Sequence, residues 1–200
     1  MTSSEQSSVR GQLRRSDKVM SDQETHAFLQ TAFCGRTASV DRDGYPYVVP
    51  NLFVWHDGAV WLHTARSDGH FARNVRDDDR VCFEVDEPGE VFPYGDLECD
   101  TSIAYRSVVL FGRIALVQDV ERARTFFSLF MRKYAPADSW GRAQGSFPRI
   151  EATNVYAIAP ESMTGKIGVL PAVEARWPAV NHSLSPQAPR PTAAPPIKRS

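Results

Sequence analysis

The segment 60–73, VWLHTARSDGHFAR, holds the residue types whose spacing most plainly suggests chemistry. An apolar, strand-like run ends at a histidine, small and polar residues follow, and a second histidine opens a short helical pattern. A phosphate group binds where backbone amides, hydroxyls and positive charge converge, and a helix N-terminus supplies amides together with a partial positive charge. The segment therefore predicts an anion cradle between a strand and a short helix.

Several side chains within residues 63–74 could complete such a cradle. Thr64 and Ser67 offer hydroxyls, and Gly69 allows a ligand to approach the backbone closely. The cationic donors available there are Arg66, His70 and Arg73. The pattern is neither a GxxxxGKS/T loop nor a GxGxxG loop, so it gives no indication of a nucleoside triphosphate or a dinucleotide. An ordinary strand–loop–helix junction with a capped helix fits the same residues.

The role of His63 stays open when the residues are considered alone. A histidine at the end of a strand can be half-buried and bonded to a backbone group, or it can lie on the surface. His56, His63 and His70 are spaced by seven residues, which places no two of them on one helical turn. We therefore expect no zinc site, and no other metal site, in this protein.

A second candidate group is Tyr105, Arg106 and Ser107, which lie near the start of a long apolar strand pattern. An arginine flanked by hydroxyl residues within a strand is unusual, because alternate side chains of a strand face the core. Arg106 could bind an anion or the edge of a ring. It could equally form a structural ion pair with Glu98 or Asp100.

A third candidate is the strand pattern YPYVVPNLFVW at residues 45–55. Pro46 and Pro50 cannot donate hydrogen bonds to a neighbouring strand, so we expect part of this strand to be an edge or to bend away. A flat aromatic cofactor could lie against such an edge, although simple core packing fits the same residues. The apolar surface and free carbonyls belong to Val48, Val49, Pro50 and Asn51.

The elements that position these candidates are mostly strands, with helices at the flanks. Ser21 and Glu24 fit a capping box at the start of a helix over 22–33, and residues 36–65 read as a three-stranded meander. The other predicted elements are a short helix over 68–77 capped by Ser67 or Asp68, strands over 80–87, 103–119 (with a bulge or bend at Gly112) and 153–166, a loop over 88–101 and an amphipathic helix over 120–135. This pattern favours a small antiparallel barrel over a doubly wound sheet.

Bulk composition narrows the class of protein further. The chain has 200 residues and a formal net charge of -1, so neither a nucleic acid nor an anionic membrane is expected as a partner. Its apolar runs are too short for a membrane helix, and its three widely spaced cysteines favour a reduced, cytoplasmic compartment. Polar residues 1–16 and the proline-rich residues 179–200 are expected to be disordered, which leaves one domain over 17–178.

Taken in order, five segments resemble the FMN-binding split-barrel superfamily typified by pyridoxamine 5'-phosphate oxidase, and most closely its Nim-type branch of 5-nitroimidazole reductases. The segments, within residues 14–178, are CGRTASVDRDGYPYVVPNLFVWHDGAVWLHTA, DGHFARNVRDDDRVCFEVDE, YRSVVLFGRIALV, KYAP and SMTGK. The resemblance implies a mostly β fold with flanking helices, in which six antiparallel strands form a split β-barrel. It also implies a homodimer that binds FMN at its interface.

The resemblance also implies roles for particular residues. The isoalloxazine ring would lie along Val48, Val49, Pro50 and Asn51. The phosphate side would be formed by His63, Thr64, Ala65, Gly69, His70 and Asn74, and Tyr105, Arg106 and Ser107 would face the cofactor region. At His70 relatives usually have Lys or Arg. Histidine is only partly charged at neutral pH, so we expect weaker or pH-dependent phosphate binding.

The predicted function is that of an FMN-dependent oxidoreductase that reduces a small nitro- or quinone-type substrate, with NAD(P)H as the reductant. In this hypothesis His63 donates a proton and Arg106 stabilises negative charge on the substrate oxygen. The alternatives are a non-catalytic flavin-binding protein and a haem-binding split barrel with His63 or His70 as the iron ligand. A deazaflavin-dependent reductase is less favoured, because the N-terminal region has no obvious basic cluster beyond Arg14 and Arg15.

Overall fold

The computed structural model describes residues 14–92, 102–135, 147 and 149–170. Its strands are β1 (Gly35–Val40), β2 (Pro46–Asn51), β3 (Phe53–His56), β4 (Ala59–Ala65), β5 (Arg80–Phe92), β6 (Ser102–Leu116) and β7 (Thr153–Gly168). Its α-helices are α1 (Asp22–Thr31), α2 (His70–Asp77) and α3 (Val120–Tyr134). Apart from residues 14–16, the two terminal extensions predicted to be disordered lie outside the described residues.

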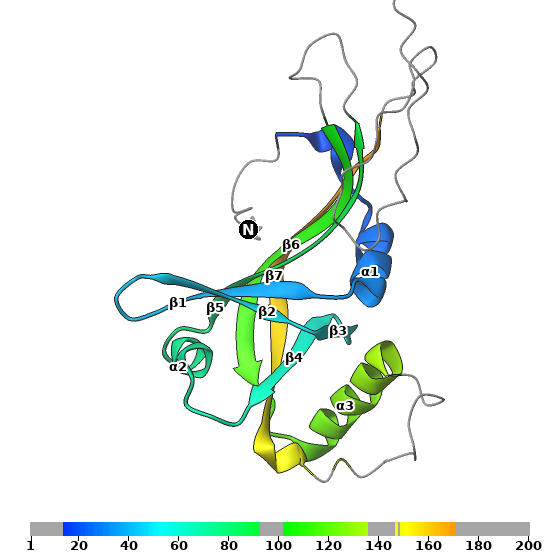
Figure 1. The fold of residues 1–200 in the computed structure, drawn as a ribbon. Helices are drawn as coiled ribbons and strands as arrows, with labels where there is room; N and C mark the ends of the chain where they lie inside the picture. The colour runs from blue at the N-terminus through cyan, green and yellow to red at the C-terminus, as the bar shows by residue number, and fades with distance from the viewer. Residues whose placement is uncertain (1–13, 93–101, 136–146, 148, 171–200) are drawn as a thin grey trace, which may run out of the picture.

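The strands form one antiparallel sheet in the order β2-β1-β5-β6-β7-β4-β3. Its two edge strands, β2 and β3, are consecutive in the chain and are separated only by Leu52. The sheet must therefore curl until its two edges meet at this residue, and β2 and β4 diverge from there (Figure 1). The result is the split β-barrel with flanking helices that the sequence predicts.

The prediction of a continuous strand over 45–55 in a three-stranded meander is wrong at Leu52. The segment breaks there into β2, which pairs with β1, and β3, which pairs with β4. The sheet consequently has seven strands where six are predicted. The expectation drawn from Pro46 and Pro50 is confirmed, because β2 is an edge strand of the sheet.

The barrel interior holds the main hydrophobic core. Val60 and Leu62 of β4 point into it, and α1 and α2 contribute Phe28 and Phe71. Helix α3 packs on the outside against a second cluster, to which Trp61 of β4 belongs. Because side chains alternate along a strand, even-numbered residues of β4 face the barrel and odd-numbered ones face α3.

Local signals explain how two of the elements begin or bend. The predicted capping box is confirmed: Ser21 Oγ accepts from the Glu24 amide at 3.3 Å, and a Glu24 carboxylate oxygen accepts from the Ser21 amide at 2.8 Å. The predicted bulge at Gly112 is also confirmed, because the β6–β7 register shifts there. A Cβ on Gly112 would lie 2.2 Å from the Ala159 carbonyl oxygen, so only glycine fits.

Two further predictions need correction. Helix α2 is capped neither by Ser67 nor by Asp68, because its N-cap residue is Gly69. The carboxylate of Asp68 instead accepts from the Arg76 guanidinium at 2.9 Å. The loop predicted over 88–101 begins as a continuation of β5 up to residue 92, and residues 93–101 lie outside the described ranges.

Candidate functional site

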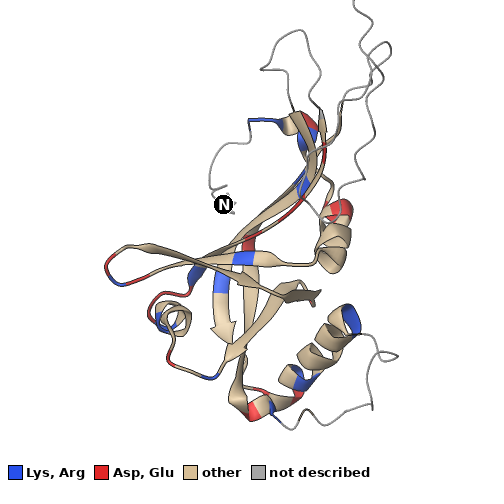
Figure 2. Ribbon diagram, in the orientation of Figure 1, with Lys and Arg blue, Asp and Glu red and all other residues tan. Residues whose placement is uncertain are grey.

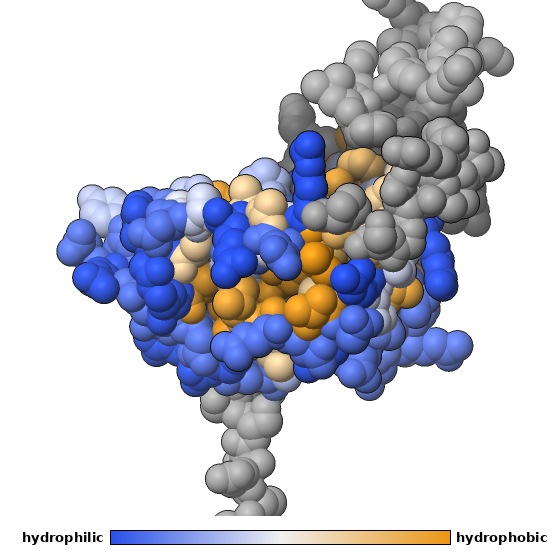
Figure 3. Space-filling model, turned by 90° about the horizontal axis from the view of Figure 1, so that it is seen from below, coloured by the Kyte–Doolittle hydropathy of each residue, from blue (hydrophilic) through white to orange (hydrophobic). Residues whose placement is uncertain are grey.

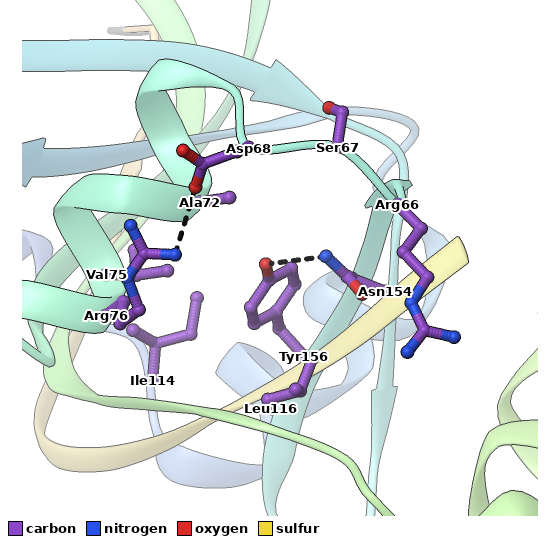
Figure 4. Close-up of a pocket in the computed structure, with 10 residues that line it drawn as sticks. All are labelled: Arg66, Ser67, Asp68, Ala72, Val75, Arg76, Ile114, Leu116, Asn154 and Tyr156. Carbon is purple, nitrogen blue, oxygen red and sulfur yellow. Dashed lines mark hydrogen bonds and ion pairs between the residues drawn. The ribbon is translucent and has the colours of Figure 1, made fainter. Parts of the chain in front are cut away.

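Helix α2 closes one end of the barrel and separates two hollows. Its buried Asn74 donates from Nδ2 to Ser39 Oγ of β1 at 3.2 Å, and the Phe71 ring makes a T-shaped contact with Tyr156 of β7. One hollow, of about 410 Å³, lies between α2 and the β1–β2 turn. The other, of about 550 Å³, lies between α2 and the neighbouring ends of β6 and β7 (Figure 4).

The hollow on the β1–β2 side gathers the predicted phosphate donors of α2. The His70 ring stacks on Tyr47 of β2, with ring centroids 4.5 Å apart, and its Nε2 lies 3.8 Å from Asp41 Oδ2. Arg73 and Asn74 line the same hollow. The His70 side chain is 45% exposed, so its imidazole is accessible to an external anion.

The N-terminus of α2 lies between the two hollows and has no capping side chain: His70 lines the smaller hollow, and Ser67 and Ala72 line the larger one. No side chain among the described residues bonds to its first-turn amides. A Cβ added to Gly69 would meet only Ser67 Oγ, at 3.5 Å, among the groups that lie within 4 Å. The backbone here is accessible, as a ligand that binds the helix N-terminus requires.

The four predicted residues of β2 divide between two faces. Val48, at 57% exposure, and Pro50 point outward, whereas Val49 packs on the core. Asn51 is buried and its Oδ1 accepts from Thr37 Oγ1 at 2.8 Å, so it joins β2 to β1. Beyond β2 the sheet has no further strand within the described ranges, which leaves the outer backbone edge of β2 open.

The side chain of His63 lies on a different face of β4 from that of Thr64, the residue after it. The His63 ring lies on the α3 face of β4, with its centroid 5.0–5.8 Å from those of Phe126, Phe127 and Phe130. Burial lowers its pKa, and its buried Nδ1 has no hydrogen-bond partner among the described residues. Thr64, on the opposite face, donates to the carbonyl of the exposed Ala65 at 3.1 Å.

Tyr105, Arg106 and Ser107 lie in the first half of β6 and do not line either hollow beside α2. Arg106 pairs with Glu87 on the adjacent β5, and its guanidinium lies over the Phe28 ring at 4.7 Å. Of the partners considered from sequence, Glu98 and Asp100 lie outside the described residues. Within one chain, Arg106 therefore forms an ion pair with Glu87 beside α1.

Charges of both signs surround α2, so the region carries no large field of one sign (Figure 2). Arg42 bonds to Asp77 at 2.7 Å and lowers the pKa of that carboxyl group. Arg80 bonds to Asp78 and lowers its pKa to about 2. These arginines are already engaged by carboxylates, whereas His70 has only its 3.8 Å approach to Asp41.

Sequence reasoning missed Tyr47 and most of the larger pocket. No local pattern places Tyr47 beside His70, because the contact depends on how α2 sits below β2. The larger pocket combines the β4–α2 turn with strand ends more than thirty residues away in the chain. Its lining residues are Arg66, Ser67, Asp68, Ala72, Val75, Arg76, Ile114, Leu116, Asn154 and Tyr156. The β6–β7 register places Leu116 opposite Tyr156, and the β4–β7 register brings the β4–α2 turn beside Asn154.

A curled antiparallel sheet with a split between β2 and β4 defines the class of split-barrel proteins. The sequence profile of the pyridoxamine 5'-phosphate oxidase family matches residues 21–167, and the chain therefore belongs to this family. A comparison with curated proteins gives no match. None of the helices in the described ranges is long and apolar enough to cross a membrane.

Solved structures share this fold at low sequence identity. The flavocytochrome Anf3 of Azotobacter vinelandii has a TM-score of 0.69 and 21% identity, over 94% of this chain and 91% of that one. A FAD and haem binding protein of Mycobacterium smegmatis has a TM-score of 0.64 and 21% identity, over 78% and 75%. A Bacteroides thetaiotaomicron protein whose name refers to 5-nitroimidazole antibiotic resistance has a TM-score of 0.62 and 20% identity, over 75% and 86%.

Proposed function

We propose that the protein is an FMN-dependent oxidoreductase that reduces a small, electron-poor substrate of the nitro or quinone type. The observation that carries the proposal is the open N-terminus of α2, which lies beside the His70–Tyr47 pair and near the unpaired edge of β2. Family membership supports a flavin as the ligand. Names of similar structures that refer to flavocytochrome, FAD and nitroimidazole resistance point the same way.

The residues present fit the phosphate of FMN. The first-turn amides of α2 have no capping side chain among the described residues, and a helix N-terminus favours an anion. His70 adds a ring N–H donor, and the absence of a Cβ at Gly69 permits close approach. Asn74 acts indirectly, because its bond to Ser39 fixes α2 against β1.

The edge of β2 fits a flat ring. Pro46, Val48 and Pro50 are every second residue of β2, and the two prolines have no amide hydrogen to donate to β1. In an antiparallel pair every second residue can direct its backbone N–H and C=O groups away from the partner strand, so these three can direct theirs away from β1. The Val48 amide and the neighbouring carbonyls would then meet the polar edge of the ring, and the exposed Val48 side chain would meet its face. Bound FMN would supply one- or two-electron transfer.

A homodimer is part of the proposal. Large apolar side chains are exposed on the β1–β2 hairpin, among them Tyr45 at 74% and Val48 at 57%. Tyr105, Arg106 and Ser107 lie apart from α2 in one chain, so a second copy is needed to bring such a segment to the cofactor. The catalytic roles of His63 and Arg106 remain predictions, as does a cytoplasmic location.

A second candidate function is haem binding at His63. The Nδ1 atom is buried without a partner among the described residues, and three phenylalanine rings surround the imidazole. A pocket of about 290 Å³ lies beside Phe127, which contacts His63. Two of the similar structures are named for haem or as a flavocytochrome. Thr64 and His70, on other surfaces, would not be ligands of this iron.

The absorption spectrum and turnover of the purified protein separate these functions. The proposal predicts flavin bands, release of FMN on denaturation and oxidation of NADH or NADPH with a nitroaromatic or quinone acceptor. A Soret band that disappears in His63→Ala would replace the proposal with the haem function. Bound flavin without turnover on any such acceptor would leave a non-catalytic flavin-binding protein.

The identity of residue 70 gives a sharper test of the cofactor site. His70→Lys supplies a fixed positive charge, and we expect it to bind FMN more tightly than the natural protein, whereas His70→Gln should bind more weakly. His56→Gln, an exposed histidine on β3, is the matched control and should bind FMN as the natural protein does. Equal affinity in all four proteins would place the phosphate elsewhere.

A further inference from the structure

The larger hollow beside α2 is not used by the proposed function. It has a volume of about 550 Å³, within the range of small-molecule sites. Helix α2 separates it from the hollow that contains His70. On the face seen from below, where the β4–α2 turn and the end of β6 lie, apolar atoms occupy the centre and hydrophilic residues surround them (Figures 1 and 3).

The floor of the pocket is apolar. Val75 of α2 and Ile114 of β6 are buried and line it, together with the buried ring of Tyr156. Leu116, at the end of β6, also lines it and is 49% exposed. Leu116 is therefore exposed to water beside three buried apolar groups. Together they provide an apolar surface that an apolar ligand would cover.

Two polar groups, the Tyr156 hydroxyl and the Arg66 side chain, lie at the edge of this floor. The Tyr156 hydroxyl points into the pocket and accepts from Asn154 Nδ2 at 3.4 Å (Figure 4). No acceptor for the phenolic hydrogen occurs in the described ranges, so the hydroxyl can donate to a ligand. Arg66 donates from Nη1 to the Glu151 carbonyl at 3.1 Å, and no carboxylate of the described chain pairs with its guanidinium.

The charge balance on the rim selects the kind of anion. Arg76 is neutralised by Asp68 at 2.9 Å, which leaves Arg66 as the cation available to a ligand on this rim. One guanidinium and one phenol can satisfy the two oxygens of a carboxylate. A doubly charged phosphate would leave one charge uncompensated near the Asp68 carboxylate, so it fits less well.

We propose that this pocket is a second ligand site, which takes a small amphipathic monocarboxylate. Its aromatic or branched aliphatic body lies on Val75, Ile114 and Leu116, and its carboxylate accepts from the Tyr156 hydroxyl and from Arg66, whose exposed side chain turns from the Glu151 carbonyl toward the pocket. The site can be tested apart from the flavin proposal, because its ligand contacts neither Gly69 nor His70, although Arg66 was also a candidate phosphate donor. The two sites share the β4–α2 turn and helix α2, whose Arg76 lines both hollows.

Calorimetric titration with 3-phenylpropanoate tests the proposal, and 3-phenylpropanamide is the uncharged control ligand. We expect the acid to bind at least ten-fold more tightly than the amide. Arg66→Gln should weaken binding of the acid about ten-fold while leaving the amide unchanged, as expected for loss of a charged hydrogen bond. Leu116→Asp should weaken both ligands. Arg132→Gln, an exposed arginine on α3, is the matched control and should bind as the natural protein does.

Amide NMR shifts recorded with the same acid locate it. Changes centred on Val75, Ile114 and Tyr156 support the site. The proposal is overturned if the acid fails to bind at millimolar concentration, or if Arg66→Gln and the natural protein bind it equally. Shifts centred on other residues overturn it too, whatever the affinity. Each measurement uses the full chain and does not depend on reductase activity.

Discussion

Replacement of Gly69 by serine should stabilise the protein and weaken FMN binding at the same time. Gly69 is the N-cap of α2, with φ −67° and ψ 168°, which is the extended conformation that an N-cap serine adopts. Its Cβ would meet only Ser67 Oγ, at 3.5 Å, within 4 Å. Serine therefore fits without strain, and its hydroxyl can accept from the amide of Phe71 or Ala72.

The two expected effects have opposite signs. A serine N-cap is better than glycine by a few tenths of a kcal/mol, which corresponds to a rise of about 1 °C in Tm for a domain of this size. The amide that the serine occupies is one that the phosphate needs. Loss of one hydrogen bond to a charged group costs about 1.5–3 kcal/mol, so FMN affinity should fall about ten-fold or more.

Thermal unfolding of the apoprotein and titration of FMN by quenching of flavin fluorescence measure the two effects. Gly69→Ala is the matched control, because it adds the same Cβ without the hydroxyl. It should lower Tm slightly, since alanine is a poorer N-cap, and should affect FMN binding less than serine does. A serine variant that is stabilised yet binds FMN normally would refute the assignment of the phosphate to the α2 N-terminus.

Three further predictions concern stability. Burial lowers the pKa of His63 in the folded protein below its ordinary value of 6.5. As the pH drops below about 6.5 the unfolded chain therefore takes up a proton before the folded one does, and the stability of the protein falls. His63→Phe should remove this fall when Tm is compared at pH 5 and pH 8. Burial lowers the pKa of Lys133 to about 8, so from about pH 8 to 10.5 the unfolded chain holds more protons and the natural protein gains stability. The free energy of unfolding of the natural protein, measured in urea, should therefore rise relative to that of Lys133→Met between pH 7 and pH 9.5. A difference between the two proteins that stays constant over this range would contradict the burial of the Lys133 amine. Gly112→Ala places a Cβ 2.2 Å from a carbonyl oxygen and should cost about 1–3 kcal/mol, whereas alanine at the open position Gly69 should cost less.

Local signals in the sequence were enough to predict most of the elements. The Ser21–Glu24 capping box and the bulge at Gly112 depend on residues close in the chain, and both are confirmed. The break at Leu52 depends on closure of the whole sheet, which local strand propensity does not contain. The two prolines of β2 predicted an edge strand. They did not predict that the chain crosses from one edge of the sheet to the other after β2.

The candidate site was less predictable for the same reason. His63 and Thr64 are adjacent in sequence, yet one faces α3 and the other faces the barrel. The strand register decides that direction, and the register follows from pairing with β7. Asp68 reads as a helix cap, but its carboxylate bonds to Arg76, one and a half turns into α2, because the chain extends through Gly69 before the helix begins.

The central claim is that FMN binds with its phosphate at the N-terminus of α2. The most direct measurement is an amide NMR titration of the apoprotein with FMN, followed at His70, Phe71 and Ala72. We expect these three amides to show the largest shifts. Riboflavin, which lacks the phosphate, should leave them nearly unchanged, and Gly69→Ser should reduce the FMN-induced shifts. Saturable binding of FMN that leaves all three amides unmoved would contradict the account.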